Sequence, residues 1–205
     1  MVVSTGVATS ADSGAVWVAS GASVSSGSSG SMVLSSGAAS TGNSGEVWLT
    51  SGPVEAGSSG NIILRTGDVV SGTPGTISLV IGETTVGDGG DFTFAAGATT
   101  DVAGTGGDII MRGGTSASTT GSAFLLTPDA TNNESGNIVV STGTTLSGSS
   151  GSLFLATGGT NPAGSSGTAV LSTGTAQSGN SGAVWVASGT AASGTSGAVT
   201  MSSGD

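Results

Sequence analysis

The sequence predicts an all-β protein, specifically a flattened, single-stranded β-solenoid of about 13 to 14 coils with about 15 residues in each coil. Two observations lead to this fold class. Three large apolar residues follow one another in short segments such as GAVWVASG, which occurs at 14–21 and again at 182–189. The same pattern then returns at a nearly constant interval, and a short fixed period with one apolar segment is typical of stacked coils.

The coils are defined by a closing glycine, after which the next apolar segment begins. Their spacing is nearly constant, and a few intervals are slightly shorter or longer than the rest. Positions are counted from the first residue of each coil. The coils begin at Ala15, Ser31, Glu46, Asn61, Thr76, Asp91, Asp108, Ser122, Asn137, Ser152, Thr168, Ala183 and Ala198.

The second and fourth positions are the predicted core. In the coil that begins at Glu46 they hold Val47 and Leu49. The fourth position of every coil holds a large apolar residue. Because neighbouring side chains of a strand point to opposite faces, both positions would face inward together. Stacking the coils would then bury two continuous columns of aliphatic side chains.

The third position would point outward, and most of its members are also bulky and apolar. A contiguous exposed apolar stripe is unusual on a monomer and typically marks an interface, although β-propensity alone explains scattered valines. We therefore predict an assembly face on this column. Its residues are Trp17, Val33, Trp48, Ile63, Ile110, Phe124, Val139, Phe154, Val170 and Trp185.

Glycine is expected at the corners of the coils, where a tight turn needs a positive φ or leaves no room for a Cβ atom. One series lies three residues before the coil end, at Gly27, Gly42, Gly57, Gly72 and Gly87. A second series follows the apolar segments, with Pro128 as the exception, and a third closes each coil.

Residues 1–205 are expected to form a single solenoid domain with irregular coils around 91–136. The 40 glycines, together with many serines and threonines, are also typical of a flexible linker. The regular apolar spacing favours the folded alternative. The ends carry no polar cap, which predicts that successive copies stack end to end or that the chain is an excerpt of a longer array.

The composition excludes several classes of function. With a net charge of −10 and only Arg65 and Arg112 as cations, the chain lacks the basic patches that bind nucleic acid or anionic membranes. It has no His, Cys, Lys or Tyr, so the usual catalytic triads and thiol nucleophiles are excluded. We expect a non-enzymatic protein without a cofactor. An extracellular or cell-surface location is expected, although this chain shows no signal peptide.

Acidic residues near the middle of the chain leave one alternative open, a calcium site at Asp88, Asp91 and Asp108, with Asp101 nearby. Carboxylates one coil apart repel each other unless they share a proton or a cation. The simpler interpretation is that they are solvated charges that limit aggregation. Arg65 is expected to pair with Asp68 or Glu83 on the surface.

These features favour a structural protein that packs end to end and side by side with its own copies into a filament. Two alternatives stay open. Short coils rich in Ser, Thr, Ala and Gly resemble the ice-binding β-solenoids, which present ranks of threonine, and TGT occurs here at 142–144 and 173–175. An aromatic row such as Trp17 and Trp48 would also suit a polysaccharide, on which its rings would stack.

Overall fold

The computed structural model describes residues 2–9, 12–161 and 163–204, and within these ranges it contains no helix and no strand. The predicted all-β solenoid is therefore wrong for the single chain. The chain divides into two units, Met1–Gly107 and Asp108–Asp205. The boundary lies inside the region 91–136, where the sequence predicts irregular coils. The single-domain organisation stays a prediction.

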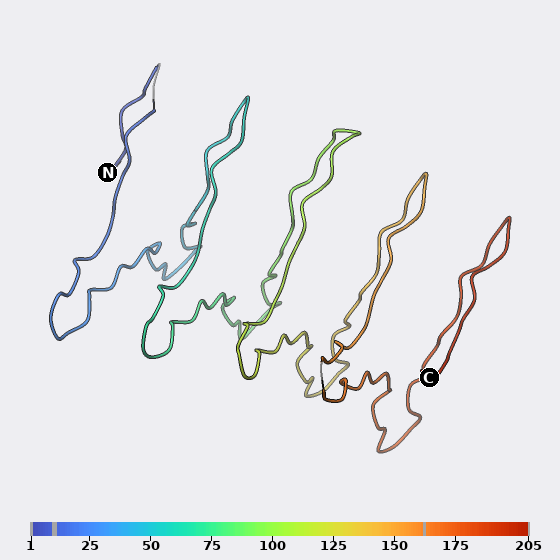
Figure 1. Ribbon diagram of the computed structural model, residues 1–205. Coiled ribbons are helices and arrows are strands. Elements are labelled where there is room, and N and C mark those ends of the chain that lie inside the picture. The colour runs from blue at the N-terminus through green and yellow to red at the C-terminus, as the bar shows by residue number, and fades with distance from the viewer. Residues whose placement is uncertain (1, 10–11, 162, 205) are drawn as a thin grey trace. The chain divides into compact units, whose positions relative to one another are not determined.

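In the first unit, stretches without turns alternate with tight bends, and the chain runs out and back in narrow loops (Figure 1). The bends lie at 25–27, 40–42, 55–57, 70–72 and 85–87, and a turn follows at 102–103. The spacing of the bends is that of the sequence repeat. The periodicity read from the sequence is thus present in the backbone, although not as strands.

Glycine closes each of these five bends with a positive φ, which is 85° at Gly42 and 111° at Gly57. An L-residue rarely adopts this conformation, because its Cβ atom collides with its own backbone. The prediction that this glycine series occupies corners of positive φ is confirmed. Four equivalent glycines of the second unit share the feature, namely Gly148, Gly164, Gly179 and Gly194.

Most loops are closed at their base by a contact that we call the neck, whereas a Cβ atom built on Gly197, the last closing glycine, would have no atom within 4 Å. A Cβ atom built on Gly45 would lie 3.5 Å from the Cβ of Ser36, and one on Gly60 would lie 3.9 Å from the Cβ of Ser51. The sixth position of a coil thus lies beside its closing glycine. The same contact recurs in the second unit, where Gly136 approaches Thr127 and Gly182 approaches Thr173.

The necks explain why the repeat does not form a solenoid. In a stack of coils of this length, a residue lies beside the residue one full period later along the chain. Here Ser36 lies beside Gly45, in the same repeat. A repeat with such a contact therefore makes one closed loop and one short link to the next loop. We call that link, positions one to five of a repeat (46–50, for example), the apolar segment.

The second unit is built in the same way. Its bends lie at 117–118, 131–133, 146–148, 163–164, 177–179 and 192–194. One neck is tighter than the others, because a Cβ on Gly113 would lie 2.5 Å from the carbonyl oxygen of Gly121. Only glycine fits at this position.

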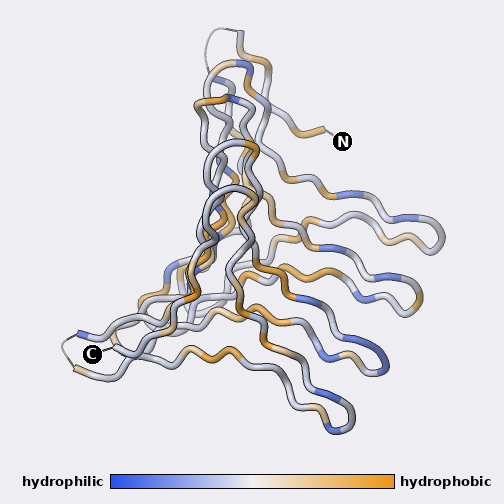
Figure 2. Tube along the Cα trace, turned by 90° about the vertical axis from the view of Figure 1, so that its right-hand side faces the viewer, coloured by the Kyte–Doolittle hydropathy of each residue, from blue (hydrophilic) through white to orange (hydrophobic). Residues whose placement is uncertain are grey.

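Neither unit has a hydrophobic core among its described residues, so the predicted inward columns are not buried. The accessible surface of the chain is 20247 Å². A compact protein of 18.9 kDa would expose only about 8,300 Å². Apolar stretches recur along the trace, separated by polar ones (Figure 2).

The backbone is equally unpaired. Its hydrogen bonds in the described ranges are Gly104 N–H to Asp101 O at 3.0 Å, Gly107 N–H to Gly97 O at 2.9 Å and Gly121 N–H to Gly114 O at 2.9 Å. A folded domain makes about one internal hydrogen bond per residue. All three bonds lie within loops or at their necks. The apolar segments therefore have free backbone donors and acceptors.

Candidate assembly face

The predicted assembly face is exposed throughout. The third-position residues Trp17, Val33, Trp48 and Ile63 of the first unit have exposed fractions of 75–89%. Those of the second unit range from 71% at Ile110 to 88% at Phe154 and Trp185. The remaining members, Phe124, Val139 and Val170, lie between these values. Every residue of the face is thus available to a partner.

The second and fourth positions are covered unequally, and neither is buried. Second-position side chains are about half exposed, such as Val47 at 54% and Ile62 at 52%. At the fourth position Leu49 is 72% exposed. The predicted core columns therefore present a further apolar surface. The apolar segments are accessible on all sides. The predicted inner and outer faces differ only in exposed fraction, which is lower at the second position than at the third.

One pair of aromatic rings confirms that second and fourth positions lie on the same side of a segment. The rings of Phe92 and Phe94 meet edge to face, with centroids 4.6 Å apart and an interplanar angle of 84°. Such pairs contribute about 0.5–1.5 kcal/mol beyond area burial. The alternation of side chains read from the sequence is therefore present here.

The polar atom of one exposed indole has a partner within its own segment. The Nε1–H of Trp48 donates a hydrogen bond of 2.6 Å to Oε2 of Glu46. Buried indoles usually find such a partner, because an unsatisfied donor is costly away from water. The indole donor of Trp48 is therefore satisfied by a charged side chain at the first position of its own segment.

The loops are stiffened by short side-chain bonds to their own backbone. The hydroxyl of Thr84 donates to the carbonyl of Val86 at 2.9 Å, and that of Thr145 donates to the carbonyl of Gly148 at 3.0 Å. A similar bond of 3.1 Å joins Thr160 to Gly164. These bonds satisfy carbonyls at the bends and are typical of Ser and Thr in turns.

The carboxylates lie mainly in the loops and leave the middle of the apolar segments uncharged. Second, third and fourth positions carry no charged residue anywhere in the sequence. Eight of the 12 acidic residues lie between a neck residue and its closing glycine: Asp12, Glu55, Asp68, Glu83, Asp88, Asp101, Asp129 and Glu134. The exceptions are Glu46, Asp91 and Asp108 at first positions and Asp205 at the end.

The predicted ion pair of Arg65 is found with Asp68, at 3.6 Å between Nη2 and Oδ2. Both side chains are highly exposed, at 70% and 98%, so the pair contributes little free energy. It joins the end of an apolar segment to the beginning of the next loop. The alternative pairing with Glu83 is not formed.

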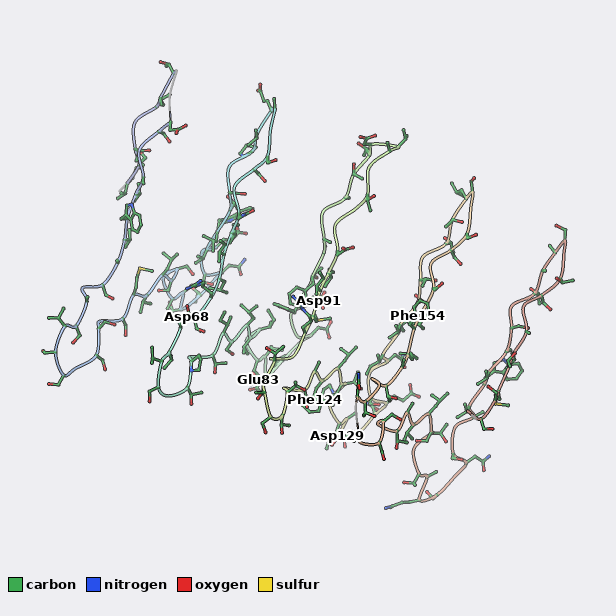
Figure 3. The ribbon with its side chains drawn as sticks, in the orientation of Figure 1. Asp68, Glu83, Asp91, Phe124, Asp129 and Phe154 are labelled. Atoms are coloured by element: carbon green, nitrogen blue, oxygen red, sulfur yellow. The ribbon has the colours of Figure 1, made fainter. Side chains whose placement is uncertain are left out.

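The structure does not bring Asp88, Asp91 and Asp108 together as ligands for a calcium ion. In the part of the chain that the structure describes, no three acidic residues come together in a way that would hold a metal ion. Figure 3 places Asp68, Glu83 and Asp91 of the first unit at separate points along the chain. Asp101 instead supports the turn at 102–103, where its Oδ1 accepts a 3.0 Å hydrogen bond from the N–H of Ala103.

No pocket is found among the described residues. Over the same ranges, no helix is long and apolar enough to cross a bilayer. The candidate functional residues are therefore those of the exposed apolar surface.

The necks are the feature that the sequence interpretation missed. The least exposed side chains of the described chain are five neck residues, namely Thr5, Ser36, Ser51, Thr66 and Thr127. The signal was present, because Ser or Thr recurs at the sixth position and a glycine closes the same repeat.

Comparison of the chain with protein-family models, with curated proteins and with solved structures gives no match.

Proposed function

We propose that this protein is a non-enzymatic structural protein that associates side by side with copies of itself and so builds a filament or fibre. The observation that carries the proposal is the accessible surface of 20247 Å², about 12,000 Å² more than a compact chain of this mass exposes. Permanent assemblies commonly bury about 2,000–5,000 Å² or more. The chain has ample apolar surface for such contacts.

The distribution of charge permits a second copy of this chain as the partner. Two copies with a charge of −10 each repel one another. Because most carboxylates lie in the loops, their repulsion acts away from the centres of the apolar segments. The aromatic members of the assembly face, such as Trp17 and Trp185, are of the residue types that dominate interface energetics.

The experiment is sedimentation velocity and electron microscopy of the purified chain over a range of concentrations. We expect a concentration-dependent transition from single chains to elongated particles. The triple variant Trp17→Ser, Trp48→Ser, Trp185→Ser should raise the concentration at which particles form by at least tenfold.

The matched control is Val24→Ser, Val70→Ser, Leu146→Ser, which removes three apolar side chains of the loops that are at least 97% exposed. It should assemble nearly as the parent chain does. A parent chain that stays monomeric at millimolar concentration would overturn the proposal, and so would a tryptophan variant that assembles like the parent. Thermal hysteresis by a monomeric chain would instead support ice binding, and retention on insoluble polysaccharide would support glycan binding.

A further inference from the structure

We infer that the methionines of the apolar segments are a redox-sensitive modification site, and that their oxidation to methionine sulfoxide by a hydroperoxide weakens the association of copies. This inference rests on the proposed self-association and names a chemical regulator of the same surface. The residues are Met32 in the first unit and Met111 and Met201 in the second. Met1 lies outside the described residues.

The first step is the position of these methionines in the repeat. Met32 holds the second position of its coil, and Met111 and Met201 hold the fourth position of theirs. The second and fourth positions of all coils carry only apolar residues, and no methionine lies in a loop. Oxidation would therefore place a polar group at positions where the sequence has none.

The second step is the access of an oxidant to the sulfur atoms. The exposed fraction of the side chain is 64% at Met32, 76% at Met111 and 93% at Met201. The sequence contains no Cys, His or Lys, so no thiol competes for a hydroperoxide and the thioether is the most nucleophilic side-chain group of the chain. We expect all three sulfur atoms to react in the single chain.

The third step is the reaction. A lone pair of the sulfur attacks the outer oxygen of the hydroperoxide, so an S–O bond forms while the O–O bond breaks. The sulfur is oxidised, and the hydroperoxide is reduced to water or an alcohol, because its leaving oxygen takes up the proton of the transferred hydroxyl. A polar, chiral sulfoxide then replaces the apolar thioether. Burying the sulfoxide oxygen without a hydrogen-bond partner costs free energy, so oxidation opposes contacts made through these positions.

The test compares the parent chain with the leucine variant Met32→Leu, Met111→Leu, Met201→Leu, because leucine conserves volume and apolar character but has no sulfur. Both are treated as single chains with hydrogen peroxide, which is then removed with catalase. Mass spectrometry counts the sulfoxides at each position, and sedimentation velocity gives the concentration needed for assembly.

We expect oxidation to raise this concentration about tenfold or more for the parent chain, because the burial of one methionine side chain changes an equilibrium constant by at least about that factor. The concentration for the leucine variant should not change. Methionine sulfoxide reductases, one for each sulfoxide epimer, should restore assembly of the oxidised parent chain.

The matched control places the sulfoxides in loops. On the leucine background, Val24→Met, Val70→Met and Leu146→Met introduce methionines at side chains that are at least 97% exposed. Peroxide should oxidise them as readily, while the concentration needed for assembly stays the same. A rise equal to that of the parent chain would overturn the role of the apolar segments.

Oxidation of preformed assemblies provides a second measurement. The rates at the three methionines of the parent chain should fall severalfold relative to single chains, while the loop methionines of the control keep theirs. Equal rates in both states would overturn the inference, because the sulfur atoms would then lie outside the contacts between copies.

The failure of this inference is distinguishable from the failure of the proposed function. If the parent chain carries all three sulfoxides and assembles as before, the inference fails although self-association stands. The same holds if peroxide prevents assembly of the leucine variant. If the untreated parent chain does not assemble, the proposed function fails and the inference fails with it.

Discussion

At the scale of single residues, the three glycine series of the repeat have different roles, although the sequence pattern alone does not distinguish them. Gly42 has φ +85° and no atom within 4 Å of its missing Cβ, so its requirement is purely conformational. Gly37, in the neighbouring loop arm, also has open space but no positive φ. Gly45 is held at a neck beside Ser36. Only the series that includes Gly42 was predicted for the reason that the structure confirms, which is a positive φ.

We predict that Gly42→Ala weakens assembly and that Gly37→Ala does not. A positive φ costs an L-residue about 1–2 kcal/mol, which corresponds to about a 5- to 30-fold change in an equilibrium constant. Because the single chain already has this bend, that factor is the upper limit of the rise in the concentration needed for assembly for Gly42→Ala, as measured by sedimentation. Gly37→Ala should leave it unchanged or lower it slightly, because alanine restricts the unassembled chain. Equal effects of the two variants would contradict a conformational role for Gly42.

At the scale of elements, the repeat divides into a loop that varies and an apolar segment that does not. The loop from Ser20 to Gly30 has an extra residue relative to that from Ser36 to Gly45, and both close at their necks. In contrast, the spacing from the second to the fourth position is the same in every repeat. The constraint on the segment follows from side-chain alternation, since an added residue exchanges its faces.

We predict that the two parts respond differently to the insertion of one serine. Insertion between Trp48 and Leu49 should prevent assembly or raise its threshold at least tenfold, because it moves Leu49 and the following segment end to the opposite face. Insertion between Gly52 and Pro53 should be tolerated, because it lengthens the first arm of a loop as the longer natural loops do. Electron microscopy and sedimentation of both variants provide the measurement. Loss of assembly with both insertions would show that loop length is also constrained.

At the scale of the whole molecule, the sequence revealed the period and the alternation but not the partner of each segment. Trp48 was predicted to be exposed, and it is. Val47 and Leu49 were predicted to be buried, and they are not, because no neighbouring repeat stacks against them. A period of this length fits a coil, but it fits a closed loop with a link equally well. The contact between Ser36 and Gly45 distinguishes the two, and such a contact is not visible in a one-dimensional pattern.

The net charge provides a further prediction at this scale. Copies with a charge of −10 repel each other at low ionic strength, where the Debye length at about 0.01 M is about 30 Å. At about 0.15 M it falls to about 8 Å, so loop carboxylates of neighbouring copies are largely screened. We therefore expect the concentration needed for assembly to fall severalfold when NaCl is raised from 10 to 150 mM, as followed by light scattering.

A variant with fewer loop charges tests the cause of this salt effect. Glu83→Gln and Asp129→Asn together remove two carboxylates from loops, and both side chains are exposed. This variant should assemble at lower concentration than the parent in 10 mM NaCl, and the difference should shrink in 150 mM NaCl. The opposite trend, with assembly weakened by salt, would mean that attraction between unlike charges holds the copies together. With Arg65 and Arg112 as its only cations, the chain has little capacity for such attraction, and burial of the second, third and fourth positions, which carry no charge, requires none.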